Sequence, residues 1–405
     1  MQLVESEENI EIEQPTSNQA LYTKGFLLLC LSHILFGASF SMIIPELPDY
    51  LISLGGEKYI GLIIALFTLT AGISRPFSGK LSDTVGRVPV MVIGTIVCVL
   101  CSLLYPLVTG VVGFLFLRFI HGFSTGFKPT AATAYAADIV PAHRRGEAMG
   151  ILGVSLNVGT SGAPPFGSYL VINYSMDTMF FVSSAVALIS VMILYGMKET
   201  LENKQKFSVK MLKLRKEEIF HPTGLRPALI TFCLYFGFGA ILTIVPNQCT
   251  YLGIENKGAY LGVITASSIA SRLVAGRVSD IYGRLIVLRV AMVCVVGSLI
   301  LLGYANSPTW LFTASGILGF SFGISSPAMF AWAIDRADPA QLGRVLATVY
   351  IALEAGIGIG ALLSAYLYQN DVSNFAFTFW VIAGISSLGF LYLLTIRGED
   401  KFVDS

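Results

Sequence analysis

The chain has 405 residues, of which 54% are hydrophobic and 13% are charged, and its mean hydropathy is +0.73. A soluble domain of average composition is about 25% charged, so this composition excludes an ordinary soluble protein. The formal net charge of +1 gives no electrostatic reason to bind nucleic acid.

Continuous apolar runs of about 20 residues follow one another along the chain, and each is long enough to cross a bilayer as a helix. Their continuity favours helices over the alternating strands of a membrane barrel. The first 23 residues carry five glutamates and no signal-peptide pattern, so soluble tails are expected at 1–23 and 398–405. Twelve membrane spans are predicted: 24–46, 58–78, 88–108, 113–136, 147–170, 177–197, 226–246, 259–277, 285–304, 309–333, 344–368 and 375–396.

Lysine and arginine set the predicted orientation, because they concentrate in cytoplasmic loops. Of 26 such residues, 20 lie in the tails and the loops of one side, and only Lys58 and Lys257 lie in loops of the other. The remaining four lie within or at the ends of spans: Arg75, Arg118, Lys128 and Arg272. We therefore expect both termini in the cytoplasm and the protein in a cell membrane, the inner membrane of a bacterium.

The loop between the sixth and seventh spans, residues 198–225, holds seven lysines and arginines between Lys198 and Lys216. Its segment "SVKMLKLRKEEIF" predicts either an amphipathic helix that binds anionic membrane lipid or a solvated linker that follows the distribution of positive charge.

The stretch "SRPFSGKLSDTVGR" at 74–87 is repeated 197 residues later as "SRLVAGRVSDIYGR", with seven of fourteen positions identical. The same offset relates further residues over about a hundred positions, which predicts two equivalent halves of six spans, 24–197 and 226–397. Because six is even, the halves are parallel repeats about an axis along the membrane normal.

Two six-helix halves, a basic central loop and "GKLSDTVGR" between the second and third spans resemble the major facilitator superfamily over the whole chain. The residues of its motif A are Gly79, Asp83, Gly86 and Arg87, with an echo at Gly276, Asp280, Gly283 and Arg284. The resemblance implies a conformational latch. Its acid, Asp83, would hold the halves together in the outward-open state, and Arg87 would pair with Asp138 at the end of the fourth span. The alternative is a simple turn that carries positive charge.

The fifth span contains "GTSGAPPFGS", residues 159–168, which resembles the antiporter signature of this family, motif C. Gly159, Pro164 and Gly167 fit that signature, whereas Ala163 and Ser168 stand where it has glycine. Paired prolines, Pro164 and Pro165, bend a helix, so this segment is predicted to be a hinge or, alternatively, a kinked packing helix.

The fourth span carries three ionisable residues, Arg118, His121 and Lys128, and its "RFIHG" resembles the family's motif B, which is associated with proton coupling or substrate binding. At 100° per residue the three share one broad face with Thr125. The resemblance implies that the fourth span lines a central cavity, so we expect this face to meet the cavity. Alternatively, Arg118 and Lys128 neutralise acids of neighbouring helices, and His121 is a hydrogen-bonded core residue.

Glu354 lies in the eleventh span without a cation nearby in sequence, which predicts a proton-binding site or, alternatively, a salt bridge to the other half. Its repeat mate, Asn157, cannot titrate. Glu46 and Asp49 end the first span and are expected near an exposed outer mouth. Further residues are candidates for binding substrate. Asn247 and Gln248 are possible hydrogen-bonding groups. The aromatic segment 235–238 either stacks on a ligand or, as the favoured interpretation, packs against lipid.

The predicted function is secondary transport by alternating access: proton-coupled efflux of a small organic compound, as in the twelve-span drug–proton antiporters that the chain resembles. The alternatives are proton-linked uptake of an organic anion, a lipid flippase and a non-transporting sensor. No nucleotide-binding loop, metal cluster or catalytic triad is present, so neither an enzyme nor a primary pump is expected, and no cofactor. Cys98 and Cys101 are expected to be packing residues, and the protein a monomer.

Overall fold

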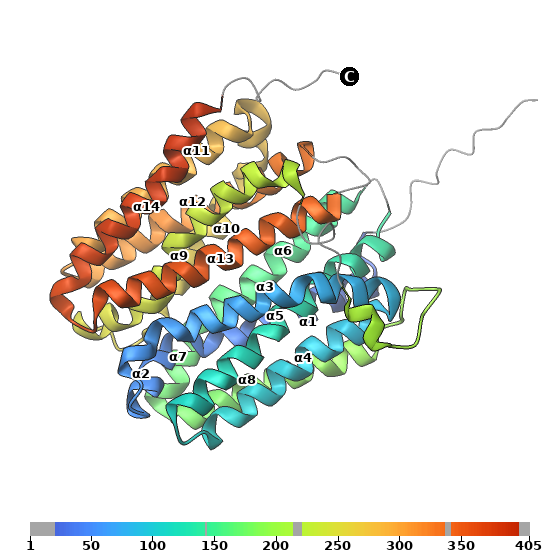
Figure 1. The fold of residues 1–405 in the computed structure, drawn as a ribbon, viewed down its shortest axis with the longest axis horizontal. Helices are drawn as coiled ribbons and strands as arrows, with labels where there is room; N and C mark the ends of the chain where they lie inside the picture. Colours follow the sequence, from blue (N-terminus) through green and yellow to red (C-terminus); the bar gives the residue numbers. More distant parts are fainter. Residues whose placement is uncertain (1–20, 142–143, 214–220, 337–341, 397–405) are drawn as a thin grey trace, which may run out of the picture.

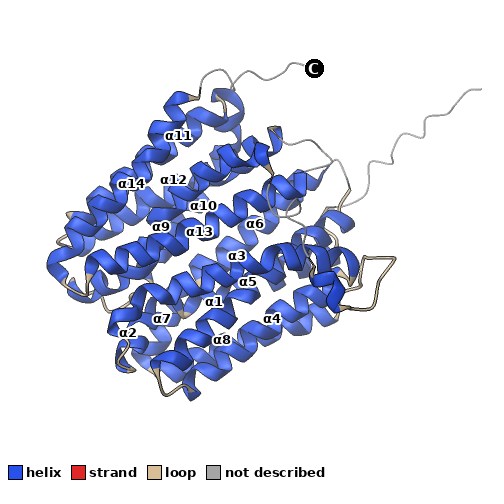
Figure 2. Cartoon of the chain, in the orientation of Figure 1, coloured by secondary structure: helices blue, strands red, loops and turns tan. Residues whose placement is uncertain are grey.

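The computed structural model describes residues 21–141, 144–213, 221–336 and 342–396. In these ranges the regular secondary structure is helical and the helices are joined by short loops (Figure 2). This confirms the predicted all-helical class. The long helices lie roughly alongside one another, as expected for segments that cross a bilayer.

The helices of the first half are α1 (Lys24–Met42), α2 (Leu47–Ser53), α3 (Ile60–Thr84), α4 (Arg87–Leu104), α5 (Val111–Ile139), α6 (Arg145–Gly162), α7 (Pro164–Asn173) and α8 (Met176–Tyr195). Those of the second half are α9 (Leu225–Tyr251), α10 (Ala259–Tyr282), α11 (Arg284–Gly303), α12 (Pro308–Asp335), α13 (Leu342–Tyr368) and α14 (Phe375–Thr395). A short 3₁₀ turn, Ile44–Glu46, joins α1 to α2.

A helix stands at each of the twelve predicted ranges, and nine described segments are long and apolar enough to cross a membrane. The other three predicted spans correspond to α5, to α6 with α7, and to α10. These are more polar: α5 and α10 carry buried or half-buried arginines, and the fifth span is broken at Ala163. The count of twelve spans therefore stays a prediction. Helices α5, α6 and α10 contribute residues to the wall of a cavity, which explains their polar side chains.

The two halves lie side by side, with the first half in blue to green and the second in yellow to red (Figure 1). Across their boundary α3 packs against α13, and α6 packs against α10. These two contacts are equivalent under the 197-residue repeat, because α3 corresponds to α10 and α13 to α6. The sequence repeat is thus also a repeat of packing.

Glycines at repeated positions explain why the same helix pairs form in both halves. A Cβ atom on Gly122 would overlap the Phe67 carbonyl of α3, and a Cβ on Gly126 would overlap the Ser74 hydroxyl. In the second half Gly319 and Gly323 meet Ile264 and Ser271 of α10 in the same way. Absent side chains at these positions let the helix axes approach closely.

The central linker marks one end of the molecule, which we call the linker end; the opposite end is the far end. The backbone N–H of Gln205 donates to the Thr84 carbonyl at 2.8 Å, and Lys80 Nζ donates to the Lys213 carbonyl at 2.7 Å. Of the predicted amphipathic helix, the structure describes a 3₁₀ turn at Val209–Leu212. Its remainder, 214–220, lies outside the described residues.

Candidate functional site

A cavity of about 930 Å³ lies between the two halves. Helices α1, α3, α5 and α6 line it from the first half, and α9, α10, α12 and α13 line it from the second. At the linker end its wall includes Asp83, whose side chain is 69% exposed. This volume falls in the range of sites that bind organic molecules, roughly 300–1,000 Å³.

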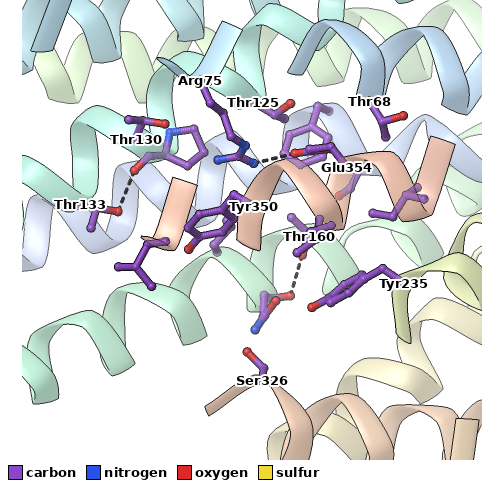
Figure 3. A pocket seen from close by; sticks show the side chains of 18 of the residues that line it. Thr68, Arg75, Thr125, Thr130, Thr133, Thr160, Tyr235, Ser326, Tyr350 and Glu354 are labelled. Atoms are coloured by element: carbon purple, nitrogen blue, oxygen red, sulfur yellow. Dashed lines mark hydrogen bonds and ion pairs between the residues drawn. The ribbon is translucent and has the colours of Figure 1, made fainter. Parts of the chain in front are cut away.

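An ion pair joins the halves inside the cavity (Figure 3): Arg75 Nη2 of α3 lies 2.6 Å from Glu354 Oε1 of α13. Both side chains are largely buried, at 13% and 9% exposure. The guanidinium also lies 4.7 Å from the centre of the Tyr350 ring. Glu354 therefore forms the salt bridge to the other half that the sequence left as the alternative.

Arg118 is fully buried on α5 and also lines the cavity. Its Nε donates to the Ile63 carbonyl at 2.9 Å, and its guanidinium lies 4.5 Å from the centre of the Phe67 ring. Its Nη2 has no hydrogen-bond partner among the described residues. The side chain thus retains unused capacity to bind an anion.

Lys128 and His121 are buried inside the first half and are not part of the described cavity wall. Lys128 Nζ donates to the Ser32 carbonyl at 2.5 Å and to the hydroxyls of Ser32 and Ser190, both at 2.9 Å. His121 lies 3.3 Å from the Tyr105 hydroxyl. The expectation that one basic stripe faces the cavity is therefore met only in part, by Arg118 and Thr125.

The packing of α5 explains this difference. Gly122 and Gly126 turn one face of α5 onto α3, which directs His121 and Lys128 towards α1, α4 and α8. Arg118 lies about 60° away around the helix from His121 and reaches the cavity instead. The alternative prediction was that Lys128 neutralises an acid of a neighbouring helix. No described carboxylate forms an ion pair with Lys128, and its hydrogen bonds go to serine oxygens instead.

Polar contacts that join the halves close the cavity at the far end. Ser168 Oγ donates to Glu46 Oε1 at 2.5 Å and accepts the backbone N–H of Gly258 at 2.8 Å. Lys257 forms an ion pair with Asp49. Glu46 is only 4% exposed and Asp49 is 47% exposed, so the expected exposed mouth is instead a sealed contact, with Glu46 buried in it.

The motif C segment forms part of this closure. Helix α6 ends at Gly162 and α7 begins at Pro164, so the span is interrupted directly before the two prolines. The Pro165 carbonyl accepts a hydrogen bond from Asn256 Nδ2 at 3.0 Å. Gly159 and Gly167 pack directly on backbone carbonyls of the first span.

Asn247 and Gln248 lie towards the far end of α9 and are not part of the described cavity wall. Gln248 is buried and its Nε2 donates to the Leu302 carbonyl at 2.9 Å. This geometry gives neither residue a contact with a molecule in the cavity.

The first copy of motif A forms a cluster at the linker end. Arg87 Nη1 lies 2.6 Å from Asp83 Oδ1, and Arg87 Nε lies 3.1 Å from Asp138 Oδ2. Gly86 has φ of 140°, a conformation that favours glycine. Gly79 lies one turn before Asp83 on α3 and also lines the cavity.

Glu199, which the sequence did not single out, completes this cluster. Its carboxylate accepts the backbone N–H groups of Arg87 and Val88 at 3.0 Å each, at the N-terminus of α4. A negative charge is favourable at this helix end.

The second copy of motif A has a related arrangement. Gly283 has φ of 89°, and Arg284 Nε lies 3.5 Å from Asp335 Oδ2, where Asp335 is the repeat mate of Asp138. The other two predicted positions, Gly276 and Asp280, lie on α10, and their surroundings are outside what the structure describes.

An aromatic wall lines the cavity from the second half. The rings of Tyr235 and Phe322 stack with centroids 5.3 Å apart, and Phe238 meets Phe322 edge-on at 5.1 Å. All three residues belong to the cavity wall. The interpretation of 235–238 as lipid-facing is therefore wrong for Tyr235 and Phe238.

Several contributors to the cavity and its closure were not recognised as functional from the sequence: Arg75, Arg272, Ser168 and Lys257. In the sequence, Arg75 and Arg272 stand out only as cations within spans. The sequence signal that could have identified the two arginines is the repeat: Arg75 and Arg272 are 197 residues apart, as are Asn157 and Glu354.

Comparisons with known proteins agree with this architecture. The sequence model of the Major Facilitator Superfamily matches residues 29–271 and 227–404. Multidrug resistance protein 2 of Bacillus subtilis is 29% identical over 260 residues, which span 61% of this chain and 64% of that protein, slightly under two thirds of its length. Multidrug resistance protein MdtG of Salmonella paratyphi C is 27% identical over 397 residues, 92% of this chain and 95% of that protein.

A solved structure gives the same answer for the fold. The D-xylose-proton symporter superposes with a TM-score of 0.76 at 16% identity, covering 93% of this chain and 98% of that one. At this identity the likeness concerns the fold alone.

Proposed function

This chain belongs to the major facilitator superfamily, and we propose that it exports a small organic compound in exchange for protons by alternating access. The relatives named as multidrug resistance proteins support the direction and the broad substrate class. The cavity volume of about 930 Å³ suits a drug-sized molecule. The transporter works as a monomer in a bacterial inner membrane, with the linker end and both termini in the cytoplasm.

The observation that carries the proposal is the ion pair between Arg75 and Glu354. It connects α3 of one half to α13 of the other within the cavity. A proton on Glu354 removes the negative charge, and with it the charge-assisted hydrogen bond to Arg75. Proton binding and release therefore loosen and restore a contact between the halves, which is what coupling to a conformational cycle requires.

The two ends of the molecule support alternating access. The far end is closed by Ser168, Gly258 and the Asp49–Lys257 pair, whereas the cavity reaches the exposed Asp83 at the linker end. This arrangement corresponds to an inward-facing state. In the opposite state the far-end contacts break, and the motif A cluster closes the linker end.

The test compares gradient-driven transport with exchange in the variant Glu354→Gln. The substrate is first identified by susceptibility and uptake screens of cells that overexpress the protein. In proteoliposomes the variant is expected to lose accumulation driven by a pH gradient but to retain counterflow, because glutamine fills the site without titrating.

Asp177→Asn, an exposed change at the start of α8, is the matched control. It should behave like the wild type in both assays. Accumulation by Glu354→Gln with unchanged pH dependence would show that this carboxyl group is not the coupling site.

A further inference from the structure

The repeat relates Arg75 to Arg272 and Glu354 to Asn157. Arg75 and Glu354 link α3 to α13, so the symmetric contact links α10, which carries Arg272, to α6, which carries Asn157. The guanidinium of Arg272 does reach α6: a Cβ atom on Gly153 would lie 4.0 Å from Arg272 Nη1. Gly153 lies one helical turn before Asn157.

The symmetric site therefore has the arginine but not the acid. Arg272 and Asn157 both line the cavity, and Arg272 Nε is buried without a hydrogen-bond partner in the described part of the chain. No ion pair to a described carboxylate includes Arg272. Asparagine offers hydrogen bonds but no charge to balance the guanidinium.

The other charges of the described cavity wall also leave an excess of positive charge: Lys80 and Arg344 belong to this wall as well, and Lys80 Nζ donates to the Lys213 carbonyl. Glu354 is already paired with Arg75, and Asp83 at the linker end is paired with Arg87. Arg118 and Arg344 add guanidinium groups that each have a nitrogen without a hydrogen-bond partner among the described residues. Buried charges need a partner, and the guanidinium fork binds carboxylate, sulfonate or phosphate oxygens in pairs.

An apolar surface accompanies these cations. Tyr235, Phe238 and Phe322 contribute packed rings to the wall on the side of the second half. Aromatic rings stack well on planar groups and contribute large contact areas. A molecule with an aromatic body and one anionic group would use both features.

We propose that the cavity binds an amphipathic organic anion whose acidic group, between Arg272 and Asn157, takes the place that Glu354 takes opposite Arg75. The inference rests on the proposed transport function and names its substrate class. The bound anion bridges α10 and α6, as Glu354 bridges α13 and α3. Substrate and proton thus act on two symmetric contacts between the same halves.

The test uses the purified full chain in nanodiscs and two fluorescent probes, fluorescein as an aromatic anion and ethidium as an aromatic cation. Binding is measured by fluorescence polarisation. Asn157→Glu supplies the missing carboxylate, so it should pair with Arg272 and weaken fluorescein binding by about tenfold or more, which corresponds to about 1.4 kcal/mol. Ethidium binding should stay unchanged or strengthen.

Two further variants separate the charge of Arg272 from its fork geometry. Arg272→Gln should weaken fluorescein binding at least as much as Asn157→Glu, and Arg272→Lys should weaken it less. Asn173→Glu makes the identical chemical change on α7, at an exposed position outside the described cavity wall. It should leave fluorescein binding unchanged, and thermal unfolding and size-exclusion profiles check that all variants fold.

Wild-type affinity for fluorescein in Asn157→Glu would overturn the proposal, as would an equal loss of both probes. A wild-type chain that binds ethidium but not fluorescein would also overturn it. Export of ethidium that depends on Glu354 would in that case leave the proposed function standing, so the two failures are distinguishable.

Discussion

Ser168 donates a hydrogen bond of 2.5 Å to Glu46, and the same hydroxyl oxygen accepts the backbone N–H of Gly258 from the other half. One side chain thus connects the first span, the fifth span and the start of α10. Ser168 stands where motif C has glycine, which has no side chain to make either contact. The departure from the motif therefore adds a polar contact to the far-end closure.

Ser168→Gly is expected to favour opening of the far end. A hydrogen bond of this kind contributes about 1 kcal/mol, which corresponds to a change of about fivefold in the ratio of open to closed molecules. The measurement is the distance distribution between spin labels at Ser53 and Glu255, exposed residues of the two halves. The six native cysteines are replaced first.

Ser184→Gly is the matched control, since it removes a partly buried hydrogen bond to the Val99 carbonyl within the first half. It should lower stability without changing the distances. If Ser168→Gly leaves the distribution as in the wild type, the serine does not hold the halves together.

The Asp49–Lys257 pair should strengthen the same closure in a salt-dependent way. Asp49 is half exposed, so the pair contributes about 0.2–1 kcal/mol. Reversing either charge should raise the open fraction a few-fold, and the double exchange Asp49→Lys with Lys257→Asp should restore it. The same labelled distances, measured at low and high salt, check this. Additive effects of the two reversals would contradict a direct interaction.

Asp83→Asn should slow transport but leave both stability and substrate affinity nearly unchanged. The side chain is 69% exposed, so its contact with Arg87 contributes little to folding. We expect its importance to arise in the opposite state, when the linker end closes. Transport rate, thermal unfolding and probe binding are compared with Glu147→Gln, which breaks another exposed ion pair at this end. A large loss of affinity with normal cycling would assign Asp83 to the binding site instead.

The sequence was sufficient for the helical membrane fold, because apolar runs and the 197-residue repeat are local or periodic signals. The contacts between the halves could not be predicted in this way. Arg75 and Glu354 are 279 residues apart, and Ser168 and Gly258 are 90 apart. No pattern along one helix shows which partner the other half supplies.

The face of α5 shows a second limit of sequence reasoning. Helical geometry grouped Arg118, His121 and Lys128 correctly around the axis, but it could not tell which part of their broad face meets the cavity. Packing decides that, through the close approach of Gly122 and Gly126 to α3. Those glycines were visible in the sequence, and their repeat mates Gly319 and Gly323 indicated the packed side.

The position of Lys128 leads to a prediction that separates it from Arg118. Its side chain is fully buried and its three hydrogen-bond acceptors belong to the neutral residues Ser32 and Ser190. Without Lys128 the two serines still bond to each other, with hydroxyl oxygens 2.8 Å apart. A methionine of similar length would pack against Phe36, whose ring centre lies 4.7 Å from Lys128 Nζ.

Lys128→Met should therefore fold with unchanged or higher stability, by up to about 1–4 kcal/mol, as when buried charged groups are replaced by apolar ones. Its relative binding of fluorescein and ethidium should equal that of the wild type, because the side chain does not reach the cavity. Arg118→Met, by contrast, should weaken fluorescein binding, since Arg118 lines the cavity. Thermal unfolding and polarisation measurements on both variants decide the matter. If Lys128→Met changes the preference between fluorescein and ethidium, the lysine contacts the ligand in another conformational state. A severe loss of stability would instead mean that the hydrogen bonds of Lys128 hold α1, α5 and α8 together.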